Sequence, residues 1–159
     1  MRTADLPAVD RIAGIVHPLF PERPEVPAER LRLFPAGCFV AASPVGPAGY
    51  AVAHPWAIGA PPALDVLLCS LPREADCLYL HDVALLPELR GSGLGAHLVR
   101  RLAALAERHL LDRLALTAVG GSAGYWRRHG FEPWGVLDAA LARKLASYGG
   151  DAVYMVCQL

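Results

Sequence analysis

The chain has 159 residues, no formal net charge at pH 7, and a hydrophobic fraction of 54%. This length suits one well-buried core, and the charge balance gives no electrostatic reason for binding nucleic acid or an anionic membrane. No apolar run approaches the roughly 20 residues that span a bilayer, and the first ten residues lack the apolar core of a signal peptide. We therefore expect a single cytoplasmic domain over residues 1–159.

The four cysteines are scattered along the chain, with no Cys-x-x-Cys pair and no cluster of cysteines with histidine ligands. Free thiols behave as small hydrophobic side chains, whereas a structural zinc needs closely spaced ligands. The pattern favours buried free thiols, and we expect no metal site.

The first half of the chain predicts two helices followed by a β-hairpin. Apolar residues recur at helical spacing between Val9 and Leu19, at Val9, Ile12, Ile15, Val16 and Leu19. A second, short helix is expected near Pro27. Residues 38–42 and 49–54 have the composition of two strands, joined by a turn at 43–47. The prolines between residues 57 and 76 indicate a loop.

The second half predicts a strand, a glycine-rich loop and a long helix. Residues 78–85 form the apolar strand, and the loop Arg90-Gly91-Ser92-Gly93-Leu94-Gly95 leads into an amphipathic helix that reaches about His109. Residues 114–119 form a second buried strand, which makes a βαβ unit with parallel strands. A shorter helix ends at Gly130, and residues 151–159 suggest a terminal strand.

The glycine-rich loop is suited to binding an anion. Glycines at alternate positions allow main-chain amides to crowd around one point, and the following helix directs its unpaired N–H groups and positive dipole end to the same point. The sequence therefore predicts a phosphate cradle at residues 90–95.

Two motifs make the chain resemble the GNAT superfamily of N-acetyltransferases. Residues 90–95 match the family pattern Arg/Gln-x-x-Gly-x-Gly/Ala, and residues 126–131 match the aromatic-x-x-x-Gly-Phe end of its next helix. The resemblance covers residues 78–131 strongly. It implies an α/β fold, a GNAT-like single domain in which helices flank a mixed, mostly antiparallel, splayed sheet with a central parallel βαβ unit. It also implies transfer of an acetyl group from acetyl-CoA to a primary amine by direct attack in a ternary complex.

Two other phosphate-binding loops fit these residues less well than a coenzyme A site. A Walker A loop needs a lysine that is absent here. The residues from Gly91 to Ala96 satisfy the loose dinucleotide fingerprint Gly-x-Gly-x-x-Gly/Ala, but the next strand ends without the acidic residue that binds ribose. Coenzyme A is the leading prediction, with a dinucleotide or a merely tight turn as the alternatives.

The resemblance also implies which residues bind acetyl-CoA. Main-chain groups of the strand would hold the pantetheine arm, and the loop would hold the diphosphate. The implied cofactor-binding residues are Val83, Leu85, Arg90, Gly91, Ser92, Gly93, Leu94 and Gly95, with Ser122 as either a helix cap or a further contact.

Acetyl transfer to an alkyl amine needs a base, because such an amine has a pKa of about 10.4. Relatives place Glu or His on the strand before the loop, at positions that correspond here to Tyr79 and His81. His81 titrates in the right range and is the leading base candidate, although an ordinary hydrogen-bonded strand histidine explains it equally well. Strand alternation puts Tyr79 and His81 on one face and Leu80 and Asp82 on the other, unless a bulge intervenes.

The acid that protonates the leaving thiolate is where the sequence departs from the family. Trp126 stands where many relatives have a tyrosine, and an indole cannot serve as a useful acid. Val119 stands where an asparagine is common. Tyr125 is the nearest substitute, but it lies roughly 100° around the helix, so solvent is the other candidate proton source.

The acceptor pocket is expected to be lined by Tyr50, His54 and Trp56, which would suit an apolar or aromatic amine; the alternative is that they are core aromatics. The acceptor is expected to be a small-molecule or protein amine. A non-catalytic acyl-CoA-binding or regulatory module is the rival function. The apolar terminal strand would permit a homodimer, as is common among relatives.

Overall fold

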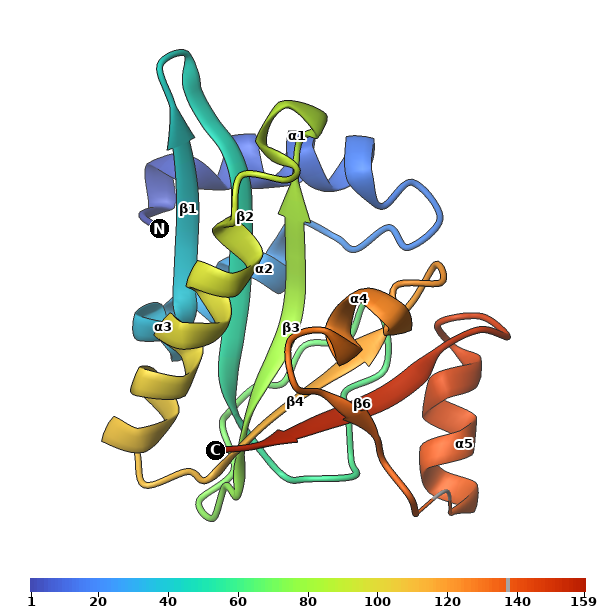
Figure 1. Cartoon of the computed structure of the whole chain (residues 1–159). Coiled ribbons are helices and arrows are strands. Elements are labelled where there is room, and N and C mark those ends of the chain that lie inside the picture. Colours follow the sequence, from blue (N-terminus) through green and yellow to red (C-terminus); the bar gives the residue numbers. More distant parts are fainter. Residues whose placement is uncertain (137) are drawn as a thin grey trace.

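The computed structural model describes residues 1–136 and 138–159, and a six-stranded sheet lies at its centre (Figure 1). The strands are β1 (Cys38–Ser43), β2 (Gly46–Trp56), β3 (Cys77–Leu85), β4 (Arg113–Ala118), β5 (Glu132–Pro133) and β6 (Val153–Gln158). Their order across the sheet is β1-β2-β3-β4-β6-β5. Strands β3 and β4 run parallel and the other neighbouring pairs antiparallel, which confirms the predicted mixed sheet and βαβ unit.

The sheet opens between β3 and β4. These strands pair from Leu78 to Leu80 on one side and from Leu114 to Leu116 on the other. Beyond this point β3 continues alongside β2 to Leu85, whereas β4 stays with β6, and the two strands diverge (Figure 1). The second half of β3 therefore has a free edge that faces the opening.

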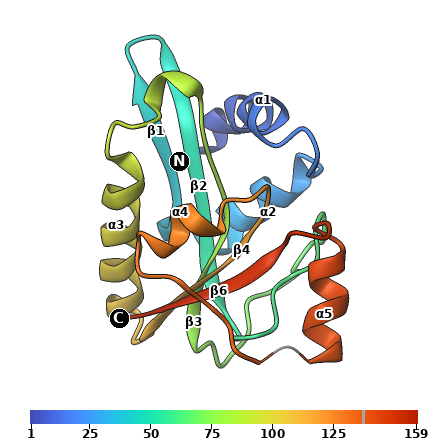
Figure 2. The ribbon, with the colours of Figure 1, turned by 45° about the vertical axis from the view of Figure 1, so that its right-hand side comes forward.

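Helices cover both faces of the sheet. The helices are α1 (Leu6–Val16), α2 (Glu25–Leu33), α3 (Leu94–Arg108), α4 (Ala123–Arg127) and α5 (Ala139–Ala146), with short 3₁₀ turns at Thr3–Asp5, Pro35–Gly37 and Pro87–Leu89. Figures 1 and 2 show α1 and α2 on one face of β1–β3, α3 on the other, and α5 beside β6. Within the described residues, every helix is too short or too polar to cross a bilayer.

The core has one part beneath each main helix. Leu102 and Leu105 of α3 pack against β2, β3 and β4, and spacings of three and four residues put them on one stripe with Leu98. Val9 and Ile12 of α1 pack against the opposite face of β2 and β3. Leu141 of α5 packs against residues of β3, β4 and β6. Burying such side chains stabilises the fold by about 1.5–3 kcal/mol each.

Parts of the fold differ from the sequence prediction. Helix α1 ends at Val16, so Leu19 lies beyond it and is 82% exposed, and Ile15 is also exposed. The sequence did not predict β5, which has two residues, or α5. The start of α5 is fixed by Asp138, whose Oδ1 accepts from the Leu141 amide at 2.7 Å.

Candidate active site

The glycine-rich loop brings the start of α3 against a deep cleft. Gly91 and Gly93 have φ angles of 76° and 81°, in the left-handed region that other residues rarely adopt. A Cβ at either position would meet nothing within 4 Å. Both glycines line a cleft of about 1430 Å³ that also passes the opening between β3 and β4. The loop therefore presents bare backbone to the cleft.

Main-chain N–H groups of this segment are free to bind a ligand. In the described part of the chain, the amides of Gly91, Gly93 and residues 94–96 donate to no protein acceptor. The amide of Arg90 differs, because it donates to the Pro87 carbonyl at 3.1 Å, which leaves the Arg90 side chain for a ligand. Free amides at the positive end of a 15-residue helix form a site for an anion.

The free edge of β3 faces the same cleft. The amide of Leu86 donates to the Ala48 carbonyl on β2 at 2.9 Å, so alternation directs the main-chain groups of Leu85 and Val83 away from β2. The Val83 carbonyl is within 3.1 Å of His17 Nε2, which donates to it. The two residues predicted to bind pantetheine thus point into the opening, and His17 contacts one of them.

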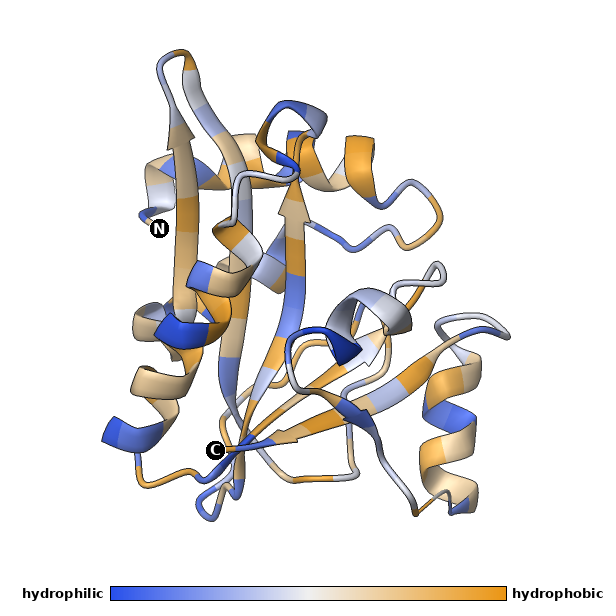
Figure 3. Ribbon diagram, in the orientation of Figure 1, coloured by the Kyte–Doolittle hydropathy of each residue, from blue (hydrophilic) through white to orange (hydrophobic). Residues whose placement is uncertain are grey.

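A β-bulge in β3 changes which side chains share a face. Val52 pairs with Asp82, whereas the next residue of β2, Ala53, pairs with Leu80, so His81 is the extra residue. As a result His81 and Asp82 both contact the segments around α1, and simple alternation, which groups Asp82 with Leu80, is wrong here. Figure 3 shows a hydrophilic band within the otherwise largely hydrophobic β3.

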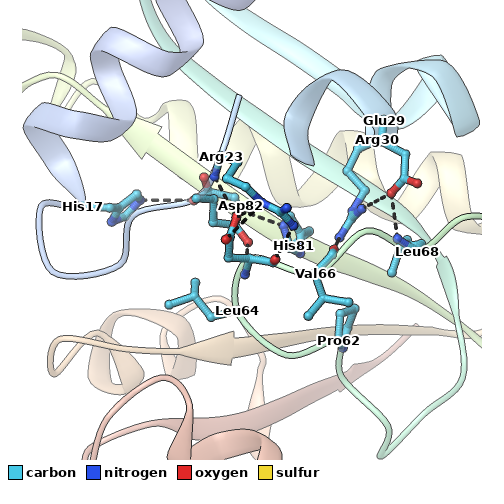
Figure 4. A network of polar contacts seen from close by, with 12 residues as sticks. His17, Arg23, Glu29, Arg30, Pro62, Leu64, Val66, Leu68, His81 and Asp82 are labelled. Carbon is cyan, nitrogen blue, oxygen red and sulfur yellow. Dashed lines mark hydrogen bonds and ion pairs between the residues drawn. The ribbon is translucent and has the colours of Figure 1, made fainter. Parts of the chain in front are cut away.

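His81 forms a buried pair with Glu22, from the segment between α1 and α2 (Figure 4). Its Nε2 lies 3.1 Å from Glu22 Oε2, and the His81 side chain is 3% exposed. Because a carboxylate can only accept, this contact keeps a proton on Nε2 and leaves the lone pair of the neutral ring on Nδ1. Nδ1 is buried and has no hydrogen-bond partner among the described residues.

Asp82 joins Tyr50 to His17. The Tyr50 hydroxyl donates to Asp82 Oδ2 at 2.5 Å, and His17 Nε2 lies 3.2 Å from Oδ1. Burial disfavours the charged form of both Asp82 and His17, yet their mutual contact lowers the pKa of Asp82 and raises the pKa of His17. Burial and the Asp82 carboxylate raise the pKa of Tyr50, which lines the cleft.

Two charged pairs hold the 57–76 loop beside this site (Figure 4). Arg23 Nε lies 3.1 Å from the Asp65 carboxylate, and the amide of Asp65 donates to Glu22 at 3.0 Å. Arg30 is fully buried and pairs with Glu29, whose oxygens also accept from the amides of residues 68–69. The loop is thereby fixed as a wall next to His81, and Glu22 is held from two sides.

Tyr79, predicted as a catalytic candidate, lies in the core. Its hydroxyl shares a hydrogen bond with Thr117 Oγ1 at 2.9 Å, and its ring stacks on Tyr154. Burial raises its pKa. The described residues that line the cleft include Thr117 but not Tyr79. Tyr79 therefore supports the site from behind and does not face it.

His54 and Trp56 also lie behind the cleft, so the expectation that they line the acceptor pocket is wrong. His54 is fully buried, with its ring centroid 5.9 Å from that of His81, and burial lowers its pKa to about 3. The Trp56 indole donates to the Ala60 carbonyl at 2.8 Å. The alternative explanation, that these are core aromatics, fits the structure.

Helix α4 lies across the opening from α3. Tyr125, predicted as the acid, is 37% exposed and lines the cleft, with its hydroxyl directly over Gly95. Ser122 also lines the cleft and makes no side-chain cap to α4, so the capping alternative does not hold. Trp126 is buried edge to face against Phe131.

Glu22 and His17 are the candidate functional residues that the sequence did not predict. Each approaches β3 from far along the chain, since Glu22 is separated from His81 by 59 positions and His17 from Val83 by 66. Neither lies in a motif. The one local signal is that Glu22 lies in the proline-rich stretch after α1. This composition predicts a loop but does not indicate which residue Glu22 contacts.

Comparisons with known proteins agree with this geometry. The model of the Acetyltransferase (GNAT) family matches residues 9–131. No curated protein sequence matches significantly. Similar solved structures include the GphF GNAT-like decarboxylase in complex with isobutyryl-CoA, with a TM-score of 0.78 and 16% identity over 99% of this chain and 96% of that one. They also include Rv2747 from Mycobacterium tuberculosis in complex with CoA and NLQ, with a TM-score of 0.65 and 20% identity over 99% of this chain and 96% of that one. A third is the ribosomal-protein-S18-alanine N-acetyltransferase from Escherichia coli, with a TM-score of 0.65 and 20% identity over 99% of this chain and 90% of that one. At these identities the likeness shows a common fold.

Proposed function

Because the chain belongs to the GNAT acetyltransferase family, we propose that it transfers the acetyl group of acetyl-CoA to the primary amine of a small molecule or a protein. One observation carries the proposal. The open edge of β3 runs from the buried His81–Glu22 pair toward the glycine-rich loop, where the amides of Gly91, Gly93 and residues 94–96 have no acceptor among the described residues. The family match and the CoA-bound structural neighbours support coenzyme A as the ligand of this edge.

The residues present suit coenzyme A. Free amides of Gly91, Gly93 and residues 94–95 suit a diphosphate, and the Arg90 side chain adds positive charge. The main-chain groups of Val83 and Leu85 suit the amides of the pantetheine arm. Because His17 already donates to the Val83 carbonyl, His17 shares or yields that acceptor when the arm binds.

Acetyl-CoA supplies a thioester, whose carbonyl carbon accepts the amine and whose thiolate leaves. His81 acts as the base: as the N–C bond forms and the C–S bond breaks, the proton of the amine passes through water to the His81 ring. Glu22 stabilises the imidazolium that results, as the orienting carboxylate of a catalytic triad does. The departing thiolate takes its proton from solvent.

The proposal is tested by following thiol release from acetyl-CoA across a panel of amines. The panel holds small aromatic and alkyl amines, lysine peptides and peptides with free N-termini. We expect acceptor-dependent release, and in His81→Ala a fall in kcat of about 100-fold or more. The Kd of CoA, measured by calorimetry, stays within about twofold because His81 is remote from the amides. His109→Ala, at the far end of α3, is the matched control.

The outcomes separate the competing functions. Full turnover in His81→Ala would clear His81 of the role. Tight CoA binding without acceptor-dependent release would favour a non-catalytic acyl-CoA-binding module. Thermal stabilisation by NAD but not by CoA would favour a dinucleotide enzyme. Homodimerisation stays a prediction, which sedimentation of the purified chain would test.

A further inference from the structure

Helix α4 and the turn that follows it place two polar side chains, Tyr125 and His129, over the phosphate cradle. An ideal Cβ at Gly95 would lie 1.7 Å from the Tyr125 hydroxyl oxygen and 3.6 Å from His129 Nε2. Gly95 is the second residue of α3, and its amide is one of those with no acceptor in the described part of the chain. The hydroxyl of Tyr125 therefore rests against the first turn of α3, in the place that a side chain at residue 95 would take.

We propose that Tyr125 and His129 complete the diphosphate-binding site from the α4 side, and that Tyr125 is a cofactor-binding residue rather than the acid at the sulfur. The proposal rests on the proposed function, because it takes coenzyme A as the ligand. In this arrangement the diphosphate lies between the amides of α3 and the side chains on the α4 side.

The chemistry of the surrounding groups favours an anion. The Tyr125 hydroxyl makes no hydrogen bond within the described residues, and it rests against Gly95, whose amide, like those of residues 93, 94 and 96, has no acceptor there. Burial raises the pKa of Tyr125, so the hydroxyl keeps its proton and can donate it. The Arg128 guanidinium lies 5.6 Å from the Tyr125 ring, and the His129 ring lies edge on at 4.7 Å. Donors that converge without an acceptor are matched by phosphate oxygens.

Tyr125 contacts the start of α3, whereas the proposed reaction centre is at His81, in the middle of β3. Leu85 and His81 are four residues apart, which at 3.3 Å per strand residue is about 13 Å. The free amides of the first turn of α3, including that of Gly95, belong to the cradle, so a hydroxyl that rests on Gly95 lies at the cradle. Figures 1 and 2 show α4 facing the beginning of α3 across the opening. A phenol has one proton, so a Tyr125 hydroxyl that donates to the diphosphate does not also donate to the sulfur.

Truncated ligands separate the two roles of Tyr125. Binding of CoA and of pantetheine, which lacks the diphosphate, is measured by calorimetry for the wild type, Tyr125→Phe and the control Tyr148→Phe. The Tyr148 hydroxyl also belongs to the cleft but donates to the Pro62 carbonyl. We expect Tyr125→Phe to weaken CoA binding about tenfold, the scale of one hydrogen bond to a charged group. Pantetheine binding and turnover of S-acetyl-pantetheine stay unchanged.

Each result has a definite meaning. Unchanged CoA affinity in Tyr125→Phe would overturn the proposal, as would an equal loss of kcat with acetyl-CoA and S-acetyl-pantetheine, which marks an acid. Failure of the wild type to bind CoA would refute the proposed function itself and is seen before any variant is compared.

A double variant tests the placement independently of activity. Gly95→Ala sets a methyl group against the Tyr125 hydroxyl, so the variant is expected to melt at a lower temperature and to bind CoA more weakly. Adding Tyr125→Phe removes the hydroxyl oxygen 1.7 Å from the Cβ position of residue 95 and leaves a ring carbon 3.0 Å from it. We therefore expect the double variant to recover part of the lost melting temperature while its CoA affinity stays low. No recovery of the melting temperature would show that the hydroxyl does not occupy this place.

Discussion

His81 depends on a carboxylate that reaches it from a distant loop. In the proposed mechanism Glu22 acts through His81 as a positioning residue, because it would fix the proton on Nε2 and offset the charge of the imidazolium. The change Glu22→Gln keeps the size but removes the charge and brings an amide that can donate. We expect kcat to fall about 10- to 100-fold while the Kd of CoA stays unchanged, measured by initial rates and calorimetry.

The control for this change is Glu25→Gln, on the exposed start of α2. It removes the same charge a few residues away and is expected to leave kcat unaltered. Equal rates in the two variants would contradict the role of Glu22. A lower CoA affinity in Glu22→Gln would show that the loop, rather than the tautomer of His81, is disturbed.

The His17–Asp82 pair makes the free energy of unfolding depend on pH. His17 has a raised pKa, so its stabilising effect is complete below its unfolded pKa of about 6.5 and is lost as pH rises through the folded value. Asp82 has a lowered pKa, so its effect is lost only as pH falls through its folded value, below 3.8. The pair therefore contributes most between these limits.

The change His17→Gln keeps a donor for the Val83 carbonyl and removes the charge. Both side chains are about one quarter exposed, so the contribution is modest. We expect the variant to be less stable than the wild type by about 1 kcal/mol near pH 5.5, and by less near pH 8.5. Urea unfolding at the two pH values measures the difference. A stability difference between the wild type and His17→Gln that grows with pH would contradict this prediction.

At the scale of elements, the turn into α3 is the part of the site whose backbone matters most. Gly93 has a φ of 81°, and a side chain there would enter the open space beside the free amides. We expect Gly93→Val to weaken CoA binding at least tenfold in calorimetry, and to destabilise the fold by about 1–2 kcal/mol because of the left-handed backbone.

The matched control is Gly14→Ala. This position lies in the regular part of α1, where an added Cβ meets nothing within 4 Å. It is expected to raise the free energy of unfolding by about 0.5–1 kcal/mol and to leave CoA affinity unchanged. Unaltered affinity in folded Gly93→Val would remove the loop from the cofactor site.

Elements with a local signature were predictable from the sequence. The period of Leu98, Leu102 and Leu105 predicts α3, and the glycines of the loop predict its start. Short elements fixed by tertiary contacts were not predictable, as β5 and α5 show. Alternation failed at the bulge of β3, because an extra residue leaves no mark in the residue types and is set by the register with β2.

At the scale of the whole molecule, the glycine-rich loop was recognisable in the sequence, but the proposed catalytic pair was half hidden. His81 lies on a recognisable strand, whereas its partner Glu22 comes from a loop whose path is decided by the Arg23–Asp65 contact. The place of His54 and Trp56 behind the cleft could not be predicted from residue type, since aromatic side chains suit a pocket wall and a core equally. Sites that combine distant segments depend on packing that no local pattern encodes.

The two halves of the molecule meet along a short stretch of paired β3 and β4, and the proposed ligand lies where they part. Coenzyme A held by β3 and α3 on one side and by α4 on the other would tie the halves together. At a free concentration of about 100 times its Kd, it should stabilise the folded state by about 2.7 kcal/mol and raise the Tm by roughly 5–10 °C.

Hydrogen exchange followed by mass spectrometry locates this effect. We expect slower exchange at residues 83–96 and at 122–130 when CoA is present, because amides on both sides of the opening become covered or held. The tip of the β1–β2 hairpin, where Val45 is exposed and remote from the cleft, should exchange equally with and without ligand. Protection confined to residues 83–96 would mean that the ligand is bound by the first half alone and that α4 takes no part in holding it.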